Sequence, residues 1–338
     1  MKAVALTRYL PINDPASLVD VDLPKPTAAG QDLLVRVEAV SVNPVDTKIR
    51  RSRPGVVESS PRVLGWDAAG VVEAVGPEVT LFKPGDEVFY AGSIMRPGTN
   101  AEFHLVDQRI VGRKPRSLSF AEAAALPLTA LTAGEAFFDR LGIDPHGAHC
   151  GRTLLIIGGA GGVGSIAIQL ARLAGLTVLA TASRTESRAW VEKLGAHHVL
   201  DHAKPLRPQL EAAGAKHVDY IANFTDTDGY WDAMVDLIRP QGRIVTIVEP
   251  RGPVALGALM GKSASVAWEL MFTRSMFGTD DMIEQHRLLD EVAALVDSGR
   301  LRTTHAETLG PINAASLRGA HARLETGRTI GKLVLAGW

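Results

Sequence analysis

A glycine-rich turn near the middle of the chain has the residue spacing that points most directly to chemistry. An uncharged apolar run starts at Thr153, and Gly159, Gly161 and Gly164 then satisfy the pattern G-x-G-x-x-G. Apolar residues follow at helical spacing, so the pattern lies between an expected strand and an expected helix. In such a unit the three glycines serve a tight turn, close approach of a pyrophosphate and helix–strand packing, in that order. We therefore predict a dinucleotide site on Gly159, Ala160, Gly161, Gly162, Val163 and Gly164.

The end of the next expected strand bears on which dinucleotide binds. An Asp or Glu usually lies there when the ribose carries a free 2′-hydroxyl. Here Ser183 and Arg184 occupy that place, and Arg188 follows one helical turn later. A hydroxyl and guanidinium groups suit a 2′-phosphate, so the sequence predicts NADP(H). The alternative is that both arginines are solvated residues at a helix start, where Glu186 weakens the positive field.

Strand and helix patterns alternate from Thr153 onward. Apolar runs predict strands over 153–158, 177–181, 198–200, 218–224 and 243–248, and helices over 162–174, 186–194, 206–213 and 229–238. This spacing fits right-handed crossovers, and hence an α/β fold with a doubly wound parallel sheet. Gly175, Gly195 and Gly242 lie where these helices are expected to stop. Since ligands bind at the carboxyl ends of such strands, Asn223 and Val248 are predicted cofactor contacts.

The two ends of the chain show a different pattern. Short apolar runs cut by Gly, Pro and Asp predict strands over 33–40, 69–75 and 87–91, typical of an irregular antiparallel barrel. Helices are expected over 281–298 and 313–326, and a closing strand over 331–335. We predict a barrel-like domain of residues 1–125, completed by 272–338, around a nucleotide-binding domain of 126–271.

Composition excludes several classes of protein. The 338 residues include 36 Lys and Arg against 37 Asp and Glu, so no basic field would gather nucleic acid or an anionic membrane. The single cysteine excludes a disulfide framework, a four-cysteine zinc lobe and an iron–sulfur cluster held by this chain alone. The first residues lack the apolar core of a signal peptide, which makes a cytoplasmic location the expectation.

Several motifs together resemble the medium-chain dehydrogenase/reductase superfamily. Residues 65–70, Gly-Trp-Asp-Ala-Ala-Gly, with Gly76 and Val79, keep the glycine frame of the signature G-H-E-x2-G-x5-G-x2-V. The stretch GGAGGVGSIAIQLAR and the later Leu194-Gly195-Ala196 resemble the quinone oxidoreductase branch, as does the ending Gly331-Lys332-Leu333-Val334. The resemblance covers nearly the whole chain and implies a Rossmann domain, a GroES-like barrel domain and a homodimer.

The same comparison shows where metal ligands are missing. Asn43 stands where the first zinc ligand of the superfamily is a cysteine, and Trp66 and Asp67 replace the His and Glu of the signature. A catalytic zinc site needs thiolate and imidazole ligands with one open position. No cysteine lies in the stretch after Tyr90, where the structural zinc lobe would fall. We therefore expect no zinc.

The resemblance also implies roles for individual side chains. It places Asn43 and Asp46 near the nicotinamide, where Asn43 could bind a substrate carbonyl, while Asp46 fits a loop-stabilising role equally well. Tyr90 is a candidate for proton donor, and Thr129 is a candidate for the carboxamide, or else an ordinary hydroxyl at a helix start. We expect Trp66, Phe272, Met276 and Phe277 to form an apolar substrate wall that is shared with a dimer core.

The missing metal directs the functional prediction. Without zinc or a His–Asp relay to hold an alkoxide, alcohol oxidation is difficult, whereas a quinone or an α,β-unsaturated carbonyl delocalises the charge it receives. A few hydrogen-bond donors can stabilise such an oxyanion. The expected activity is NADPH-dependent reduction of a small quinone or enone. A zinc alcohol dehydrogenase and a non-catalytic NADPH-binding protein are the competing hypotheses.

Overall fold

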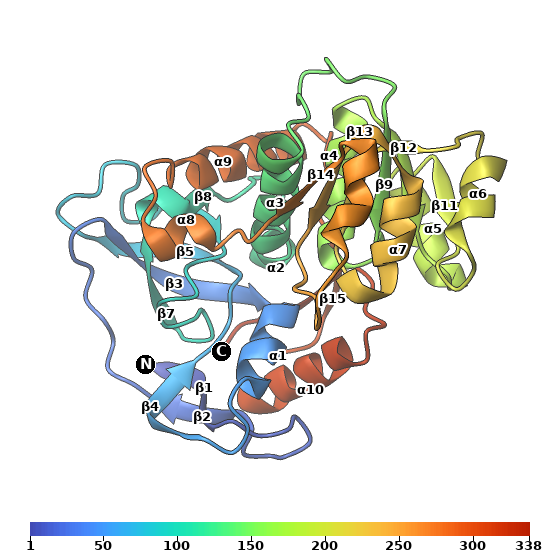
Figure 1. Cartoon of the computed structure of the whole chain (residues 1–338). Helices are drawn as coiled ribbons and strands as arrows, with labels where there is room; N and C mark the ends of the chain where they lie inside the picture. Colours follow the sequence, from blue (N-terminus) through green and yellow to red (C-terminus); the bar gives the residue numbers. More distant parts are fainter. The chain divides into compact units, whose positions relative to one another are not determined.

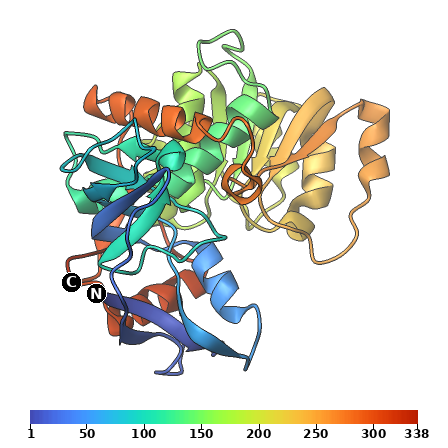
Figure 2. The same cartoon turned by 90° about the vertical axis from the view of Figure 1, so that its left-hand side faces the viewer.

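The computed structural model describes all residues from Met1 to Trp338, and these form two compact units. Unit 1 combines Met1–Leu131 with Phe272–Trp338, and unit 2 is Thr132–Met271. Both ends of the chain lie in unit 1, close together in two views (Figures 1 and 2). None of the helices combines the length and the apolar content that a membrane span requires.

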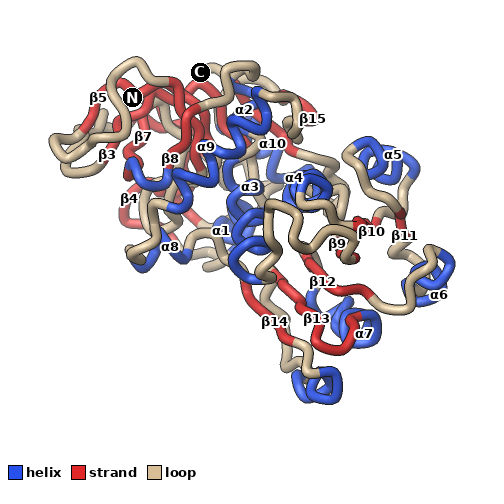
Figure 3. Tube along the Cα trace, turned by 90° about the horizontal axis from the view of Figure 1, so that it is seen from above, coloured by secondary structure: helices blue, strands red, loops and turns tan.

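Unit 2 is built on six parallel strands in the order β11-β10-β9-β12-β13-β14. Helices α4 and α5 lie on one face of this sheet and α6 and α7 on the other (Figure 3). The doubly wound parallel sheet is therefore confirmed. The strands are β9 (Thr153–Ile157), β10 (Thr177–Thr181), β11 (His198–Leu200), β12 (Val218–Asn223), β13 (Ile238–Thr246) and β14 (Ser265–Trp268). The helices are α4 (Gly162–Leu173), α5 (Thr185–Lys193), α6 (Leu206–Ala212), α7 (Thr227–Leu237), the π-helix η2 (Glu135–Arg140) and the 3-10 helix η3 (Leu256–Lys262).

Burial on both faces explains the apolar runs of these strands. Leu155, Leu179, Ile221 and Ile244 are buried in one cluster, which also receives Trp231 from α7. Parallel strands covered by helices on both sides carry continuous apolar residues rather than alternating ones. The chain leaves β9 for β10 on one side and returns to β12 on the other, so the strand order reverses between β9 and β12. That reversal is where ligands bind in such sheets.

The glycine stops were predicted correctly at two of three places. Gly175 and Gly195 have φ values of 78° and 106°, the left-handed conformation that ends a helix. The expectation for Gly242 is wrong, because this residue lies inside β13. A Cβ at Gly242 would lie 2.6 Å from Ile238 Cδ1, so close approach explains the glycine there. Strand β14, of four residues, was not expected.

Unit 1 contains two further sheets. One has the order β2-β1-β4; the other has the order β15-β16-β3-β5-β6-β8, with β7 also paired to β3. All pairs are antiparallel except β15 with β16. The strands are β1 (Lys2–Arg8), β2 (Val19–Asp22), β3 (Asp32–Ser41), β4 (Val57–Val63), β5 (Ala68–Val75), β6 (Glu87–Tyr90), β7 (Phe103–Asp107), β8 (Val111–Arg113), β15 (His305–Thr308) and β16 (Lys332–Ala336).

Strand β16 joins the end of the chain to its beginning, since Val334 pairs with Ser41 of β3. The helices of this unit are α1 (Pro44–Arg51), α2 (Phe120–Ala124), α8 (Thr273–Phe277), α9 (Glu284–Asp297), α10 (Ala314–Glu325) and the 3-10 helix η1 (Gln108–Ile110), while α3 (Pro127–Gly134) runs across the division between the units. The two longest helices of this unit, α9 and α10, lie near the C-terminus of the chain.

Two helical glycines, Gly164 and Gly319, are expected to respond in opposite ways to substitution by alanine, measured as the free energy of unfolding. At Gly164 in α4 a Cβ would lie deep inside contact with the Gly158 carbonyl oxygen, whereas at Gly319 in α10 it would meet nothing within 4 Å. We expect Gly164→Ala to lower the free energy of unfolding by about 1–3 kcal/mol through overpacking. Gly319→Ala should raise it by up to about 1 kcal/mol through helix propensity. Urea unfolding measures both, and equal stability of the two variants would contradict this account.

Candidate functional site

The glycine-rich turn lies directly after β9, at the point where the strand order reverses. The tight turn uses Gly158, whose φ is 86°, and not Gly159 as expected from the motif. Gly159 is needed for another reason, because a Cβ there would lie 2.9 Å from the Cβ of Ala180 in β10. At Gly164 a Cβ would collide with the Gly158 carbonyl oxygen. Helix α4 therefore packs closely on the turn that follows β9.

Gly161 differs from its neighbours, because a Cβ there would meet only the Gly158 carbonyl oxygen, at 3.5 Å. Packing within the chain thus gives little reason for a glycine at this position. The amide groups of Ala160, Gly162, Val163 and Gly164 donate no hydrogen bond within the chain. They lie at the start of α4, where free N–H groups and the helix dipole favour an anion. The turn can therefore bind a phosphate group.

The residues predicted to select the 2′-phosphate lie together at the end of β10. Arg184 is the N-cap residue of α5. The guanidinium of Arg188 donates to the carbonyl oxygens of Ala182 and Val199, each at 3.3 Å. Ser183 Oγ lies 3.1 Å from Nε2 of His202, an exposed residue for which the sequence predicted no role at this site. Folding, rather than spacing in the sequence, brings this imidazole close to Ser183.

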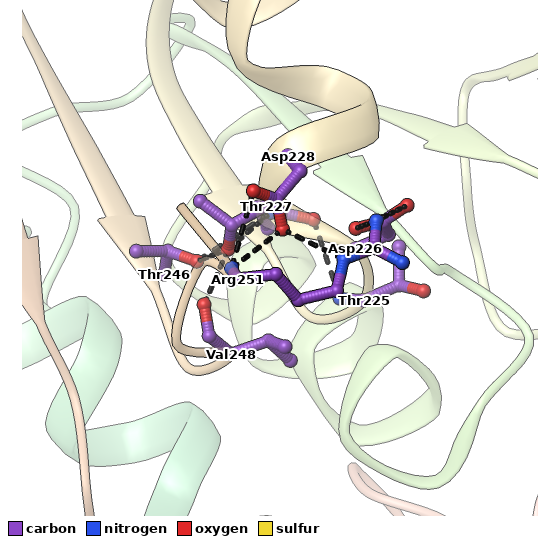
Figure 4. A network of polar contacts seen from close by, with 8 residues as sticks. Thr225, Asp226, Thr227, Asp228, Thr246, Val248 and Arg251 are labelled. Atoms are coloured by element: carbon purple, nitrogen blue, oxygen red, sulfur yellow. Dashed lines mark hydrogen bonds and ion pairs between the residues drawn. The ribbon is translucent and has the colours of Figure 1, made fainter. Parts of the chain in front are cut away.

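The carboxyl ends of β12 and β13 are joined by a buried polar network (Figure 4). Thr227 and Thr246 share a hydrogen bond of 2.7 Å, and the amide of Asn223 donates to both hydroxyl groups, at 3.3 and 3.4 Å. The Thr227 hydroxyl also donates to the Val248 carbonyl oxygen. Asn223 and Val248 thus hold two neighbouring loops in place, and the Asn223 side chain is fully buried. Its predicted contact with a cofactor would require this network to open.

In unit 1 a buried carboxylate, Asp67, organises the region predicted to do chemistry. Its Oδ1 accepts a hydrogen bond of 2.7 Å from the amide of Leu128. Its Oδ2 accepts from Ser41 Oγ at 2.9 Å and from Lys332 Nζ at 2.9 Å. Lys332, which the sequence marked only as part of the ending motif, also donates to the Val42 carbonyl oxygen at 3.0 Å. Both charges are buried, and each neutralises the other.

Asn43 belongs to the same cluster and has no free donor. Its Nδ2 donates to the Trp66 carbonyl oxygen at 3.0 Å and to Asp67 Oδ2 at 2.8 Å, while its Oδ1 accepts from Lys332. An amide has only two N–H donors, so both are committed within the fold. A substrate carbonyl could bind Asn43 only by replacing one of these bonds.

Asp46 is the carboxyl group of this region with an uncommitted oxygen. Its Oδ2 accepts a 2.8 Å bond from the amide of Asn43 and so stabilises the start of α1, as the loop-stabilising alternative expected. Its Oδ1 is buried with no hydrogen-bond partner. Burial raises the pKa of Asp46 to about 7, against the opposing effects of the Asn43 amide and Lys332. The group therefore changes its charge near neutral pH.

Tyr90 is fully buried and bonded inside the barrel. Its hydroxyl lies 3.2 Å from His104 Nδ1, and His104 Nε2 lies 2.9 Å from the Pro97 carbonyl oxygen. Because that carbonyl can only accept, the imidazole proton is on Nε2 and Tyr90 donates to Nδ1. Burial raises the pKa of Tyr90 and lowers that of His104 to about 4. This geometry gives Tyr90 a structural role and does not favour the proton-donor role expected for it.

The expected apolar wall is only partly assembled. Trp66 is buried and packs edge-to-face on Phe272, with ring centroids 6.3 Å apart. Met276 is half-buried, whereas Phe277 is 75% exposed and so lines no enclosed surface. Thr129 is buried in α3 and donates to the Leu126 carbonyl oxygen at 3.0 Å, which leaves its oxygen able to accept.

A buried acidic pair in unit 2 was not predicted. Glu269 directly follows β14, and both it and Glu135 of the π-helix η2 are buried. Burial and the neighbouring Glu135 raise the pKa of Glu269, although Arg140 Nε lies 2.9 Å from its Oε2. Two carboxyl groups far apart in sequence give no local signal, so only the fold could reveal them.

The raised pKa of Asp46 predicts a pH-dependent stability difference from Asp46→Asn. The folded state holds this proton more tightly than the unfolded chain, where the group has a value near 3.8. The wild-type protein should therefore lose stability relative to Asp46→Asn as pH rises from about 4 to about 7, by on the order of 3 kcal/mol. Urea unfolding across this range measures it, with exposed Asp280→Asn as control. A difference that does not vary with pH would refute the assignment.

Comparison with known proteins shows which family the chain belongs to. Residues 29–131 match the alcohol dehydrogenase GroES-like domain, and residues 194–335 match a family described as zinc-binding dehydrogenase. A zinc-type alcohol dehydrogenase-like protein of Staphylococcus aureus is 47% identical over 312 residues, which is 92% of each chain. The 2-methylene-furan-3-one reductase of Solanum lycopersicum is 30% identical, covering 99% of this chain and 79% of the reductase.

Solved structures give the same result. A Rhizobium etli protein described among zinc-dependent alcohol dehydrogenases superposes with a TM-score of 0.95 at 57% identity, over 100% of this chain and 98% of that one. Escherichia coli quinone oxidoreductase complexed with NADPH superposes with a TM-score of 0.83 at 26% identity, over 99% and 100%. The chain therefore belongs to the medium-chain dehydrogenase/reductase superfamily of oxidoreductases, in its quinone oxidoreductase-like branch.

Proposed function

We propose that this protein is an NADPH-dependent oxidoreductase that reduces a small quinone or α,β-unsaturated carbonyl without zinc. The observation that carries the proposal is the turn after β9, where four free amides surround a glycine that the chain's own packing does not require. In this proposal residues 126–271 form the NADP(H)-binding domain. Residues 1–125 and 272–338 form the catalytic domain.

The residues of unit 2 fit a dinucleotide phosphate. The turn from Gly159 to Gly164 would hold the pyrophosphate on its free amides, and the absent side chain of Gly161 leaves room for it. Ser183, Arg184 and Arg188 would hold the 2′-phosphate at the end of β10. When bound, NADPH supplies the hydride. The relative in E. coli that was solved with NADPH supports this cofactor.

The residues of unit 1 do not fit a catalytic zinc ion. Zinc is held by thiolate, imidazole or carboxylate groups, whereas Asn43 and Trp66 offer an amide and an indole at two of the expected positions. Asp67 accepts four hydrogen bonds already, one of them from the ammonium of Lys332. No group of three His, Cys, Asp or Glu side chains is arranged to hold a metal. We derive no step through zinc.

The substrate class follows from what the side chains can do. An acceptor that spreads its new charge over a phenolate or an enolate needs only hydrogen-bond donors and a proton. Tyr90 and Asn43 already donate inside the fold, which favours solvent as the proton source. Asp46 Oδ1 is the position in this cluster that can hold a proton near neutral pH. The tomato reductase and the bacterial quinone oxidoreductase support these two acceptor classes.

We also propose a homodimer that works in the cytoplasm. Strand β14 is the edge of the parallel sheet, and its outer edge has no partner strand. Trp268 at its end is 52% exposed and Leu270 beyond it is 49% exposed. An unpaired edge with exposed apolar side chains is a surface on which a second copy of the chain can pair.

The function is tested by following NADPH oxidation with quinones, enones and aldehydes in turn, and NADP+ reduction with alcohols. We expect turnover with quinones or enones, no alcohol oxidation, and activity that survives treatment with a chelator. Activity confined to alcohols and dependent on stoichiometric zinc would instead support a zinc alcohol dehydrogenase. Tight NADPH binding without any oxidation would support a protein that binds the cofactor and does not turn over.

The cofactor assignment is tested by Arg184→Ala. Removing a charge-assisted hydrogen bond to the 2′-phosphate should raise the Kd for NADPH by about tenfold and leave the Kd for NADH unchanged. Arg207→Ala, which removes an exposed ion pair with Asp236 elsewhere in unit 2, serves as the matched control. Equal Kd values for NADPH in the wild-type protein and in Arg184→Ala would reject the assignment.

A further inference from the structure

We propose that Arg251 is a positioning residue of the dinucleotide site, where it offsets part of the negative charge of Asp226 and Asp228 near the phosphate-binding turn. Both acids lie on the loop and helix that follow β12, and Arg251 lies on the loop that follows β13. The proposal rests on the function proposed above, because it assumes a dinucleotide at the carboxyl edge of the sheet.

The chain segment just before the two acids contacts the glycine turn directly. The amide of Phe224 donates to the Ile157 carbonyl oxygen at 3.0 Å, so the chain after β12 runs beside the chain after β9. A Cβ on Gly158 would lie 3.5 Å from the Cβ of Thr225. Asp226 is the next residue, so it belongs to the chain segment that runs beside the turn with the free amides.

The start of α7 explains why acids are found there. Asp226 is the N-cap residue of this helix and Asp228 lies in its first turn, where negative charge is favoured by the helix dipole. The Asp226 side chain folds back over the first turn of α7, because a Cβ at Gly229 would lie 2.6 Å from its Oδ2. The same charges would repel an anionic ligand, because exposed charges act over about 8 Å at physiological salt.

Arg251 bonds to both carboxylates (Figure 4). Its backbone amide donates to Asp228 Oδ2 at 3.0 Å, and its Nε donates to the same oxygen at 3.3 Å. Its Nη2 donates to Asp226 Oδ1 at 3.2 Å. One guanidinium thus spans two acids that belong to a neighbouring element, and it leaves one net negative charge in place of two.

Arg251 affects the charge near the glycine turn more than it affects the stability of the fold. The bases of both loops are held by the buried bonds among Asn223, Thr227 and Thr246 described above. The Arg251 side chain is 77% exposed, and exposed ion pairs contribute little to stability. Removing the guanidinium should therefore leave the fold unchanged and uncover the two acids.

The test is the Kd of purified full-length variants for NADPH and for NADH, measured at low and at high ionic strength. At low ionic strength we expect Arg251→Gln to weaken binding of both cofactors by about fivefold, and high salt should remove the difference. Equal effects on NADPH and NADH separate this role from that of Arg184, which concerns the 2′-phosphate. The combination of Arg251→Gln with Asp226→Asn and Asp228→Asn should bind both cofactors at least as tightly as the wild-type protein, because it also removes the remaining negative charge. Arg251→Lys should weaken binding less than Arg251→Gln does.

A matched control is Arg239→Gln, which removes the 2.7 Å ion pair with Asp219. Asp219 lies at the amino end of β12, so this change should not alter the affinity for either cofactor. Unchanged affinity in Arg251→Gln at low ionic strength, while the wild-type protein binds NADPH, would overturn the inference alone. Weaker binding that persists at high salt and is not restored by the two Asn substitutions would also overturn it. If the wild-type protein binds neither cofactor, the proposed function fails and the inference fails with it.

Discussion

The close packing of three chain segments around the end of β9 is the constraint on which the proposed cofactor site depends. β10 approaches Gly159, α4 approaches Gly158 through Gly164, and the loop after β12 approaches Gly158 from the other side. Gly159 and Gly164 have no room for a side chain, and the positive φ of Gly158 favours glycine there. The outcome is a turn that leaves four amides unpaired at the start of a helix, at the point where the strand order reverses. Such amides favour an anion.

Unit 1 is organised by a different interaction, the buried ion pair between Asp67 and Lys332. The two residues are 265 positions apart in sequence, so their pairing joins the last strand to the first part of the barrel. The same two charges occupy one donor and the acceptor of the Asn43 side chain, whose other donor binds the Trp66 carbonyl oxygen. Residues that occupy the positions of zinc ligands in the superfamily are therefore already bonded to one another. The region has an electrostatic centre of its own, and Asp46 is the adjacent group whose charge changes near neutral pH.

Charge at the carboxyl edge of the sheet of unit 2 is balanced locally. Free amides and the basic group around Arg184 favour phosphates, while Asp226 and Asp228 oppose them. The two acids stabilise the start of α7, and Arg251 offsets their cost for an anionic ligand. Negative charge at Asp226 and Asp228 thus stabilises the helix but disfavours an anionic ligand. The guanidinium of Arg251, from the neighbouring loop, reduces that charge without removing the two acids.

The sequence by itself determined the class of fold and the place of the glycine-rich turn after β9. Strands and helices of unit 2 were recognisable because burial on both faces leaves long apolar runs, and glycine spacing is a local property. Tertiary structure alone decided which glycine makes the turn, that Gly242 lies in a strand, and that Asn43, Tyr90 and Asn223 have their polar groups occupied. It also decided the partners of Lys332, His202 and Arg251. The physical reason is that hydrogen bonds between distant segments depend on which backbone segments lie side by side. Local sequence patterns do not specify that arrangement.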